Sequence, residues 1–347
     1  MNSRLLGGLT PRTFLHRHWQ KRPLFVRGAL PRFAGLWDEK SATRALFALA
    51  ARDDVESRMV GRRAARWETV HGPFKRISLG NRNSTLLVSG VNLHVAAADR
   101  LLRRFHFIPQ ARLDDVMVSY ATPGGGVGPH VDSYDVFLLQ GPGRRRWRVG
   151  RNTYVAEPGD MLYVPPGWKH DGVALEACFT YSIGFRAPRG AELAAAFLDW
   201  LHERGLPDAM FRDPGRAPVR SPALIPSELV DFANRVVARI SWSKSDSTRF
   251  LGEYLTLPKP HVVFRPGRGR RSLGRSRVRL DPKTQLLYRG ARYFINGEAV
   301  NVPRGAVAAL RELADRREAS GGRLARAGLA ELISGWQRLG YLHLERP

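Results

Sequence analysis

Residues 124 to 186 carry the pattern that most constrains what this chain can fold into. The stretch opens with the glycine-rich turn GGGVGPHVD and continues later as PGDMLYVPPGWKH. The second segment is typical of a turn, an apolar strand, a second turn and a returning histidine. The glycines are followed neither by the lysine nor by the helix of a P-loop, so they do not predict phosphate binding.

Three residues in this stretch predict a metal site. Successive side chains of a strand point to opposite faces, so His130 and Asp132 share a face and Val131 takes the other. The second segment brings His170 back to the same neighbourhood. Two histidines and one carboxylate form a facial triad, which leaves coordination positions open as in non-haem Fe(II) oxygenases. We interpret the remaining histidines as ordinary core or surface residues.

The segment GRRRWRV between the two halves indicates an anion-binding arginine. If Trp147 and Val149 face the interior, alternation places Arg145 inside and leaves Arg144, Arg146 and Arg148 outside. A buried guanidinium needs an anionic partner, and the carboxylate of a co-substrate suits its paired N–H groups.

Three hydroxyl side chains are candidates to complete the binding of that co-substrate. They are Ser119, which precedes the glycine-rich turn, and Thr180 and Ser182, which lie near the end of residues 124–186. Each hydroxyl could instead bond to the backbone, so the residues alone leave both roles open.

Size and charge set wider limits. A chain of 347 residues has room for two or three domains, and 43% hydrophobic with 25% charged residues is a globular composition. No apolar run approaches the roughly 20 residues that span a bilayer, so we expect no membrane segment.

Prolines 11, 23 and 31 interrupt the basic N-terminus, which argues against an amphipathic transit peptide. The single cysteine, Cys178, excludes an intramolecular disulfide and fits a reducing cytosol.

The formal net charge of +25 favours contact with a polyanion such as RNA. The alternative is an arginine-rich surface that is merely solvated.

Periodicity predicts the other elements. Helices are expected near 12–22, 40–52, 96–105, 191–204, 226–240, 250–257, 305–317 and 324–339, and strands at 24–26, across 55–87, and at 114–120, 288–295, 299–302 and 341–344. Asn296-Gly297 is a tight hairpin turn, and residues 265–279 read as a basic, glycine-broken linker. A strand pair packed on two helices predicts a winged-helix-like domain at the C-terminus.

The central motifs resemble those of the bacterial ribosomal oxygenases, JmjC-type cupin proteins that hydroxylate an arginine of a large-subunit ribosomal protein. The resemblance extends upstream to FLHRHWQKRPLFVRG and WETVHGPF and, more weakly, to the C-terminus. It implies an α+β fold with a double-stranded β-helix (jelly-roll) barrel, a helical dimerisation region and a winged-helix-like domain. The expected divisions are residues 1–188, 189–257 and 258–347.

The same resemblance implies Fe(II), 2-oxoglutarate and O₂ as reactants, and a cytoplasmic homodimer. Carried over by position, His130, Asp132 and His170 would bind iron, and Arg145 would hold the distal carboxylate of 2-oxoglutarate. Two departures from the family pattern stand out. Ala121 lies where a polar group is expected to aid co-substrate binding, and the loop between Tyr154 and Glu157 is short, so one wall of the substrate groove should differ.

The charge raises a further expectation, because a basic enzyme should repel a basic ribosomal protein. A locally acidic groove would resolve this conflict, with Asp114, Asp115, Asp135 and Asp171 as its candidates.

Three alternatives to an arginyl hydroxylase remain. The first is a hydroxylase that modifies histidine, as related eukaryotic enzymes do. The second is a nucleic-acid-binding regulator that uses the C-terminal domain and the basic linker. The third is a cupin without oxygenase activity, which would have no need of a buried guanidinium such as that of Arg145.

Overall fold

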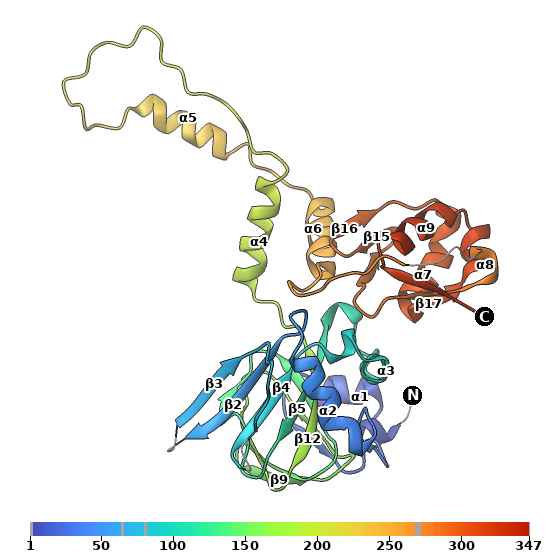
Figure 1. The fold of residues 1–347 in the computed structure, drawn as a ribbon. Helices are drawn as coiled ribbons and strands as arrows, with labels where there is room; N and C mark the ends of the chain where they lie inside the picture. The colour runs from blue at the N-terminus through green and yellow to red at the C-terminus, as the bar shows by residue number, and fades with distance from the viewer. Residues whose placement is uncertain (1–2, 64–65, 80–81, 268–271, 347) are drawn as a thin grey trace. The chain divides into compact units, whose positions relative to one another are not determined.

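The computed structural model describes residues 3–63, 66–79, 82–267 and 272–346. The chain divides into two compact units, whose helices and strands are drawn in Figure 1. The first unit comprises residues 1–187, 258–285 and 303–347, and the second comprises residues 188–257 and 286–302. In the described part of the chain, no helix is long and apolar enough to cross a bilayer.

Two antiparallel sheets form the framework of the first unit, with the orders β1-β10-β7-β12-β5-β4-β2-β3 and β6-β11-β8-β9. The strands are β1 (Leu24–Val26), β2 (Ser57–Arg63), β3 (Arg66–His71), β4 (Ser84–Val88), β5 (Leu113–Ala121), β6 (His130–Val131), β7 (Asp135–Gln140), β8 (Arg145–Val149), β9 (Asn152–Ala156), β10 (Met161–Val164), β11 (Lys169–Ala174) and β12 (Cys178–Phe185). Apolar side chains from both sheets, including Leu138 of β7 and Trp147 of β8, pack in one cluster. This pair of packed antiparallel sheets agrees with the expected barrel.

The large sheet lies between the small sheet and a layer of helices. On β7, Val136 and Leu138 pack toward the small sheet, whereas Phe137 and Leu139 belong to the core that includes the helices. The helices are α1 (Pro11–Arg17), α2 (Glu39–Ala50) and α3 (Ala96–Arg103), with 3₁₀ turns η1 (Ser3–Leu6), η2 (Val91–Leu93) and η3 (Gln110–Arg112). Because alternate residues of β7 are apolar on both faces, this strand is central to the fold.

The first helix begins where the sequence predicts and ends at Arg17, earlier than the predicted residue 22. Thr10 caps it by accepting a hydrogen bond from the backbone N–H of Thr13 at 3.1 Å, and Pro11 occupies its first position. Pro23 follows the helix, and β1 then pairs with β10. The predicted helix and strand at this end of the chain are confirmed.

The inner face of the large sheet is partly polar. Val118, Tyr181 and Ile183 belong to the helix-side core, so their strand neighbours Ser119 and Thr180 take the opposite face. Ser119 and Thr180 lie directly across from each other in the β5–β12 pair. Alternation thus separates an apolar helix side from a hydroxyl-bearing inner side.

The C-terminal part of the first unit combines a small sheet with short helices. The sheet has the order β17-β13-β18, and its elements and neighbours are η4 (Leu273–Arg275), β13 (Arg277–Leu280), η5 (Arg304–Ala306), α7 (Val307–Arg316), β17 (Glu318–Ser320), α8 (Gly321–Arg326), α9 (Ala330–Arg338) and β18 (Leu342–Glu345). The single helix predicted over residues 324–339 is wrong. Gly328, with φ +77°, separates α8 from α9. The last residues of the expected linker form β13, and part of that linker lies outside the described residues.

The second unit contains α4 (Gly190–His202), α5 (Ser227–Val237), α6 (Lys244–Thr256) and the sheet β14 (Leu286–Arg289), β15 (Arg292–Ile295) and β16 (Glu298–Val300). The strand predicted over residues 288–295 is two strands, because Gly290 with φ +64° turns the chain between them. The turn at Asn296-Gly297 is confirmed, with φ values of +48° and +93°. Both positions are left-handed, which suits a type I′ hairpin turn.

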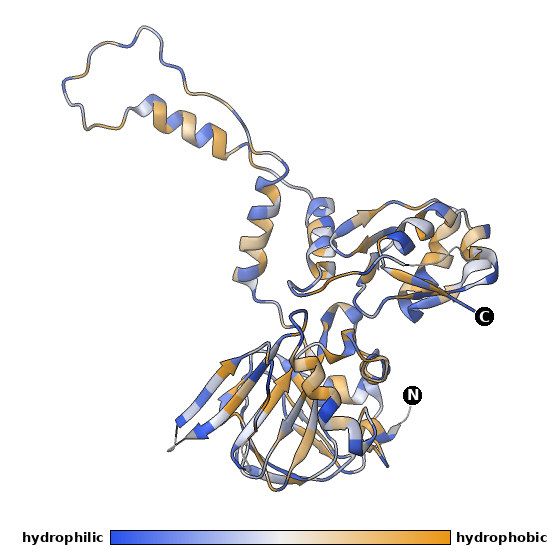
Figure 2. Cartoon of the chain, in the orientation of Figure 1, coloured by the Kyte–Doolittle hydropathy of each residue, from blue (hydrophilic) through white to orange (hydrophobic). Residues whose placement is uncertain are grey.

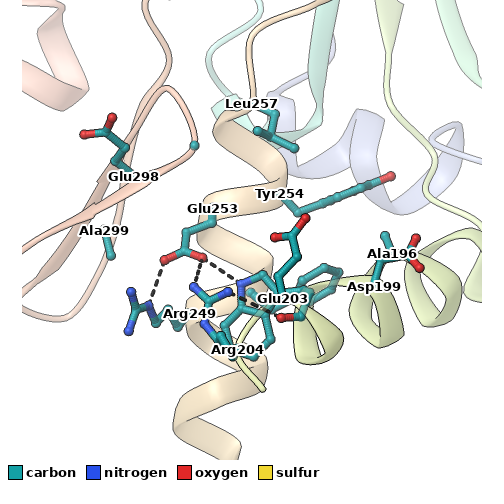
Figure 3. Close-up of a pocket in the computed structure, with 13 residues that line it drawn as sticks. Ala196, Asp199, Glu203, Arg204, Arg249, Glu253, Tyr254, Leu257, Glu298 and Ala299 are labelled. Carbon is teal, nitrogen blue, oxygen red and sulfur yellow. Dashed lines mark hydrogen bonds and ion pairs between the residues drawn. The ribbon is translucent and has the colours of Figure 1, made fainter. Parts of the chain in front are cut away.

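An ion cluster joins α4 to α6 inside the second unit. Glu253 accepts hydrogen bonds from Trp200 Nε1 at 2.7 Å, Arg204 at 2.8 Å and Arg249 at 2.7 Å (Figure 3). The Arg204 guanidinium also lies over the Trp200 ring, 3.7 Å from a ring centroid. A cavity of about 690 Å³, with Asp199, Glu203 and Glu298 among its lining residues, adjoins the cluster.

The helix α5 buries none of its residues within this unit. Its apolar residues recur at helical spacing, as in Leu229, Phe232 and Val236, and Figure 2 shows apolar residues repeating along α4 and α5. An amphipathic helix without a buried face lacks the packing that usually stabilises such a helix.

Candidate metal and co-substrate site

The three predicted ligands meet at one point of the first unit. His130 on β6 lies directly across from His170 on β11, and Asp132 follows β6. One ligand atom from each residue lies within 4.8 Å of the others. Val131 between them is 56% exposed, so the strand alternates as predicted. Among the described residues, no other group of three histidine, cysteine or acidic side chains gathers in this way.

Backbone carbonyls orient both imidazole rings. His130 Nδ1 is 2.9 Å from the Gly128 carbonyl oxygen, and His170 Nδ1 is 3.0 Å from that of Trp168. A carbonyl can only accept, so each Nδ1 donates its hydrogen and each Nε2 keeps a lone pair. The Nε2 atoms lie 3.9 Å and 3.6 Å from the Asp132 carboxylate oxygens, for His130 and His170 respectively. The donor set therefore converges on a space suited to one cation.

Burial keeps His170 in the form that binds metals. Burial lowers the pKa of His170, and neighbouring His130 lowers it further, although the hydrogen bond with Trp168 opposes the shift. The ring is therefore neutral at neutral pH, with a lone pair available. Burial and the Asp132 carboxylate together raise the pKa of Tyr134, so that hydroxyl stays protonated.

The triad opens into a cavity of about 440 Å³ between the two sheets. Besides the triad, its lining residues include Arg58, Thr69, His71, Thr85, Leu87, Met117, Ser119, Val136, Leu138, Arg145, Trp147, Thr180 and Ser182. The four predicted co-substrate residues (Ser119, Arg145, Thr180 and Ser182) thus share a cavity with the triad. Residues of β2, β3 and β4 form one wall of the cavity, and no motif in residues 124–186 predicts them.

Arg145 faces the cavity, as alternation predicts. It is 4% exposed, whereas its neighbours Arg144, Arg146 and Arg148 are exposed. Its Nε and Nη2 atoms are buried and have no hydrogen-bond partner among the described residues. Trp147 packs beside it, with the guanidinium carbon 5.6 Å from a ring centroid. Unpaired, buried N–H donors fit the carboxylate of a small anionic molecule.

The hydroxyl candidates differ in their surroundings. The Thr180 hydroxyl donates to Gln140 Oε1 at 3.4 Å, and the Gln140 amide in turn donates to the Gly143 and Phe179 carbonyls. Thr180 therefore has a partner inside the protein. Ser119 and Ser182 are buried on the inner face of the large sheet and line the cavity.

The two departures also have a place in the structure. Ala121 is fully buried and packs with Ala174 and Cys178 in a cluster of small side chains. The chain from Tyr154 continues in β9 to Ala156, and a turn follows at Glu157. In this turn the backbone N–H of Glu157 donates a hydrogen bond to the Asp160 carboxylate.

The four candidates for an acidic groove lie outside this cavity. Asp171 pairs with Arg148 at 2.6 Å, Asp114 with Lys259 at 2.9 Å, and Asp115 with Lys259 at 3.7 Å. Buried Asp135 accepts from Tyr163 at 2.5 Å and lies 3.4 Å from Arg112. These carboxylates are neutralised by basic partners or serve the core, so they offer no free negative charge to a basic protein.

Comparison with known proteins adds to this geometry. Residues 100–156 and 152–193 match the JmjC domain, and residues 239–343 match a ROXA-like winged helix. The chain is 34% identical over 84% of its length to the ribosomal protein uL16 3-hydroxylase of Escherichia coli, of which it covers 85%. It is 26% identical over 49% of its length to the bifunctional lysine-specific demethylase and histidyl-hydroxylase NO66 of Drosophila persimilis, of which it covers 29%.

A solved structure covers nearly the whole chain. The ribosomal oxygenase YcfD from Escherichia coli, in complex with cobalt and 2-oxoglutarate, has a TM-score of 0.82 and 31% sequence identity to this chain. The similarity covers 97% of this chain and 98% of that one.

Proposed function

This chain belongs to the JmjC-domain ribosomal oxygenase family, and on that basis we propose that it is an Fe(II)- and 2-oxoglutarate-dependent hydroxylase. Its proposed substrate is an arginine of ribosomal protein uL16 in the large subunit, which receives a hydroxyl at C3. The observation that carries the proposal is the buried guanidinium of Arg145, in the same cavity as the triad, whose Nε and Nη2 atoms have no partner in the described part of the chain.

Different residues of the cavity would bind the metal and the co-substrate. His130, Asp132 and His170 would hold the metal, and the cavity beside them would receive the co-substrate. Bound Fe(II), 2-oxoglutarate and O₂ supply the conversion of C–H to C–OH, with succinate and CO₂ as co-products. Arg145 orients 2-oxoglutarate by its distal carboxylate, and apolar walls that include Leu138 and Trp147 exclude water.

Arginine is favoured over histidine as the target. The uL16 3-hydroxylase resembles this chain over 84% of its length, whereas the histidyl-hydroxylase resembles it over 49% and at lower identity. A cupin without oxygenase activity is disfavoured, since it gives no reason to keep the Arg145 donors unpaired in the interior.

The test is direct hydroxylation. The purified chain, supplied with Fe(II) and 2-oxoglutarate, should consume 2-oxoglutarate and add one oxygen atom to an arginine of uL16, as located by fragment mass spectrometry. His130→Ala should abolish both readouts. Absence of 2-oxoglutarate turnover in the unchanged chain would overturn the proposal, and so would full turnover by His130→Ala. Oxygen found on a histidine would overturn only the target assignment.

We further propose that this chain acts as a homodimer through its helical region, residues 189–257, and that it works in the cytoplasm, where ribosomes assemble. Support for the dimer comes from α5, which buries nothing within its own unit.

Electrostatic association with ribosomal RNA is a second proposed interaction. The net charge of +25 favours a polyanion, and the paired state of Asp114, Asp115 and Asp171 leaves those carboxylates unable to attract a basic substrate. RNA around uL16 in an assembling subunit would supply the missing negative charge. Binding of the full chain to a ribosomal RNA fragment should weaken steeply as salt rises, and absence of binding at low salt would remove this proposal.

A further inference from the structure

Thr85 carries a buried hydroxyl in the wall of the first unit's large sheet. It lies on β4, between β2 and β5, and is fully buried. Its Oγ1 atom has no hydrogen-bond partner among the described residues. A buried hydroxyl without a hydrogen-bond partner destabilises a folded protein. Such a hydroxyl is therefore a candidate to bind a ligand.

The hydroxyl belongs to the wall of the metal cavity. Along β4, Leu86 and Val88 join the core that includes the helices, whereas Thr85 and Leu87 line the cavity. Alternation of strand side chains thus places Thr85 on the same inner face as Ser119 of the neighbouring strand.

Register places Thr85 near the end of the cavity that holds Arg145. Arg145 lies across from Ala174, and Ala174 packs against Ala121 and Cys178. Ala121 in turn lies directly across from Thr85. Thr85 and Arg145 are therefore cross-strand neighbours of the same cluster of small side chains, Ala121, Ala174 and Cys178.

Thr85 and Arg145 both line the cavity, and both have fully buried side-chain donor atoms without a hydrogen-bond partner among the described residues. A carboxylate has more lone pairs than one guanidinium edge can satisfy, so a hydroxyl can donate to it as well. Ala121, at the position where a polar group is expected, offers no donor.

From these contacts we infer that the Thr85 hydroxyl is the second anchor of the distal carboxylate of 2-oxoglutarate, beside Arg145. The inference rests on the proposed function. Thr85 is a positioning residue, and it supplies from β4 the hydrogen bond that Ala121 on β5 does not.

The experiment measures binding, so that it does not depend on turnover. Thr85→Val replaces the hydroxyl with a methyl group of similar shape. The dissociation constant of 2-oxoglutarate for the Mn(II)-loaded protein, measured by calorimetry, should rise about tenfold, since a hydrogen bond to a charged group is lost. Thr85→Ser, which keeps the hydroxyl, should bind 2-oxoglutarate far better than Thr85→Val.

Three controls separate the loss of the hydrogen bond to the distal carboxylate from a loss of folding. The melting temperature of ligand-free Thr85→Val should stay equal or rise, because the unpartnered hydroxyl is gone. Thr284 is equally buried, but its hydroxyl donates to the Tyr341 carbonyl at 2.7 Å. Thr284→Val should therefore lower the melting temperature and leave 2-oxoglutarate binding unchanged. Binding of 2-oxobutanoate, which lacks the distal carboxylate, should be the same with and without Thr85→Val.

The outcomes distinguish this inference from the proposed function. If the unchanged Mn(II)-loaded protein does not bind 2-oxoglutarate, the proposed function fails. If it binds, and Thr85→Val binds equally well or loses ligand-free stability as Thr284→Val does, the role of Thr85 is overturned.

Discussion

At the scale of single residues, Arg145 combines deep burial with two donor atoms that have no partner among residues the structure describes. Arg145→Met keeps much of the side chain's length and removes the charge. We expect ligand-free stability to rise by about 1–3 kcal/mol, because the unpaired donors no longer lose their hydration on folding. The KM for 2-oxoglutarate should rise about 100-fold. Urea unfolding and co-substrate titration provide the two measurements, and a drop in ligand-free stability would indicate a structural role instead.

Gly172 lets Trp147 lie flat beside the site. The two residues are paired across β11 and β8, and a Cβ added at Gly172 would lie 2.5 Å from the Trp147 ring. Gly172→Ala should therefore displace the ring and cost about 1–3 kcal/mol, seen as a lower melting temperature. Gly61 is the matched control, since it lies in β2 with open space around an added Cβ. If Gly61→Ala and Gly172→Ala melt alike, the packing explanation is wrong.

The sequence predicts the residues of the site unequally. Alternation along one strand places Arg145 inside and puts His130 and Asp132 on one face, and the turn–strand–turn segment that ends at His170 predicts the return of the third ligand from β11. Thr85 is missed because its importance depends on the pairing of β4 with β5, which no local pattern encodes. The pairing of Asp171 with Arg148 is missed for the same reason, since it joins two strands.

At the scale of elements, glycines and caps decide where the sequence misplaces boundaries. Gly290 and Gly328 adopt positive φ and divide elements that periodicity joins. The start of α6 is earlier than predicted because Ser243 and Asp246 form a capping box ahead of the apolar residues. The helices α2, α4 and α5 and the Asn296-Gly297 turn are predicted well, since their signals are strong and local.

Glu253 makes the packing of α4 on α6 sensitive to pH. Burial opposes its ionisation, but hydrogen bonds from Arg249 and Trp200 and the charge of Arg204 outweigh burial, and the pKa of Glu253 is lowered. A carboxyl with a lowered folded-state pKa stabilises the fold above its unfolded pKa and stops doing so as pH falls through the folded value. Glu253→Gln should therefore speed hydrogen exchange in α4 and α6 about tenfold at pH 7.

The difference between Glu253→Gln and the unchanged chain should shrink as the pH falls below about 4. Hydrogen-exchange mass spectrometry at matched pH measures it. Glu203→Gln, in the same cavity and exposed, is the control and should exchange like the unchanged chain (Figure 3). A difference for Glu253→Gln that does not depend on pH would contradict the assignment of the effect to its charge.

At the scale of the whole molecule, the proposed homodimer can be tested by measuring the molar mass of the protein in solution. Leu229 and Val237 of α5 are 39% and 65% exposed, so charges there leave the chain's own core intact. The unchanged chain should have twice the mass of one 38.9 kDa chain by light scattering. Leu229→Asp combined with Val237→Asp should give a single-chain mass, because two charges would be buried at the interface. Asn234→Asp adds charge to the same helix and should stay dimeric, and a dimeric double variant would exclude α5 as the contact.

Net charge is known from composition, but its distribution is a property of the fold. The sum of +25 is unchanged by folding, whereas the pairing of Asp114 and Asp115 with Lys259 joins distant parts of the chain. Composition therefore indicates the class of partner, and only the fold tells which acidic residues are already neutralised.

The cross-strand position of Thr85 and Ala121 bears on how such proteins are compared. Thr85 lies before residues 100–193, the part of the chain that matches the JmjC domain. A survey of relatives that scores one alignment column at a time would record Ala121 as the loss of an anchor. A survey that groups columns by the barrel wall they share would record an exchange between neighbouring strands. Covariation between these two columns, rather than identity in either, is the signature that such an exchange would leave in a set of homologues.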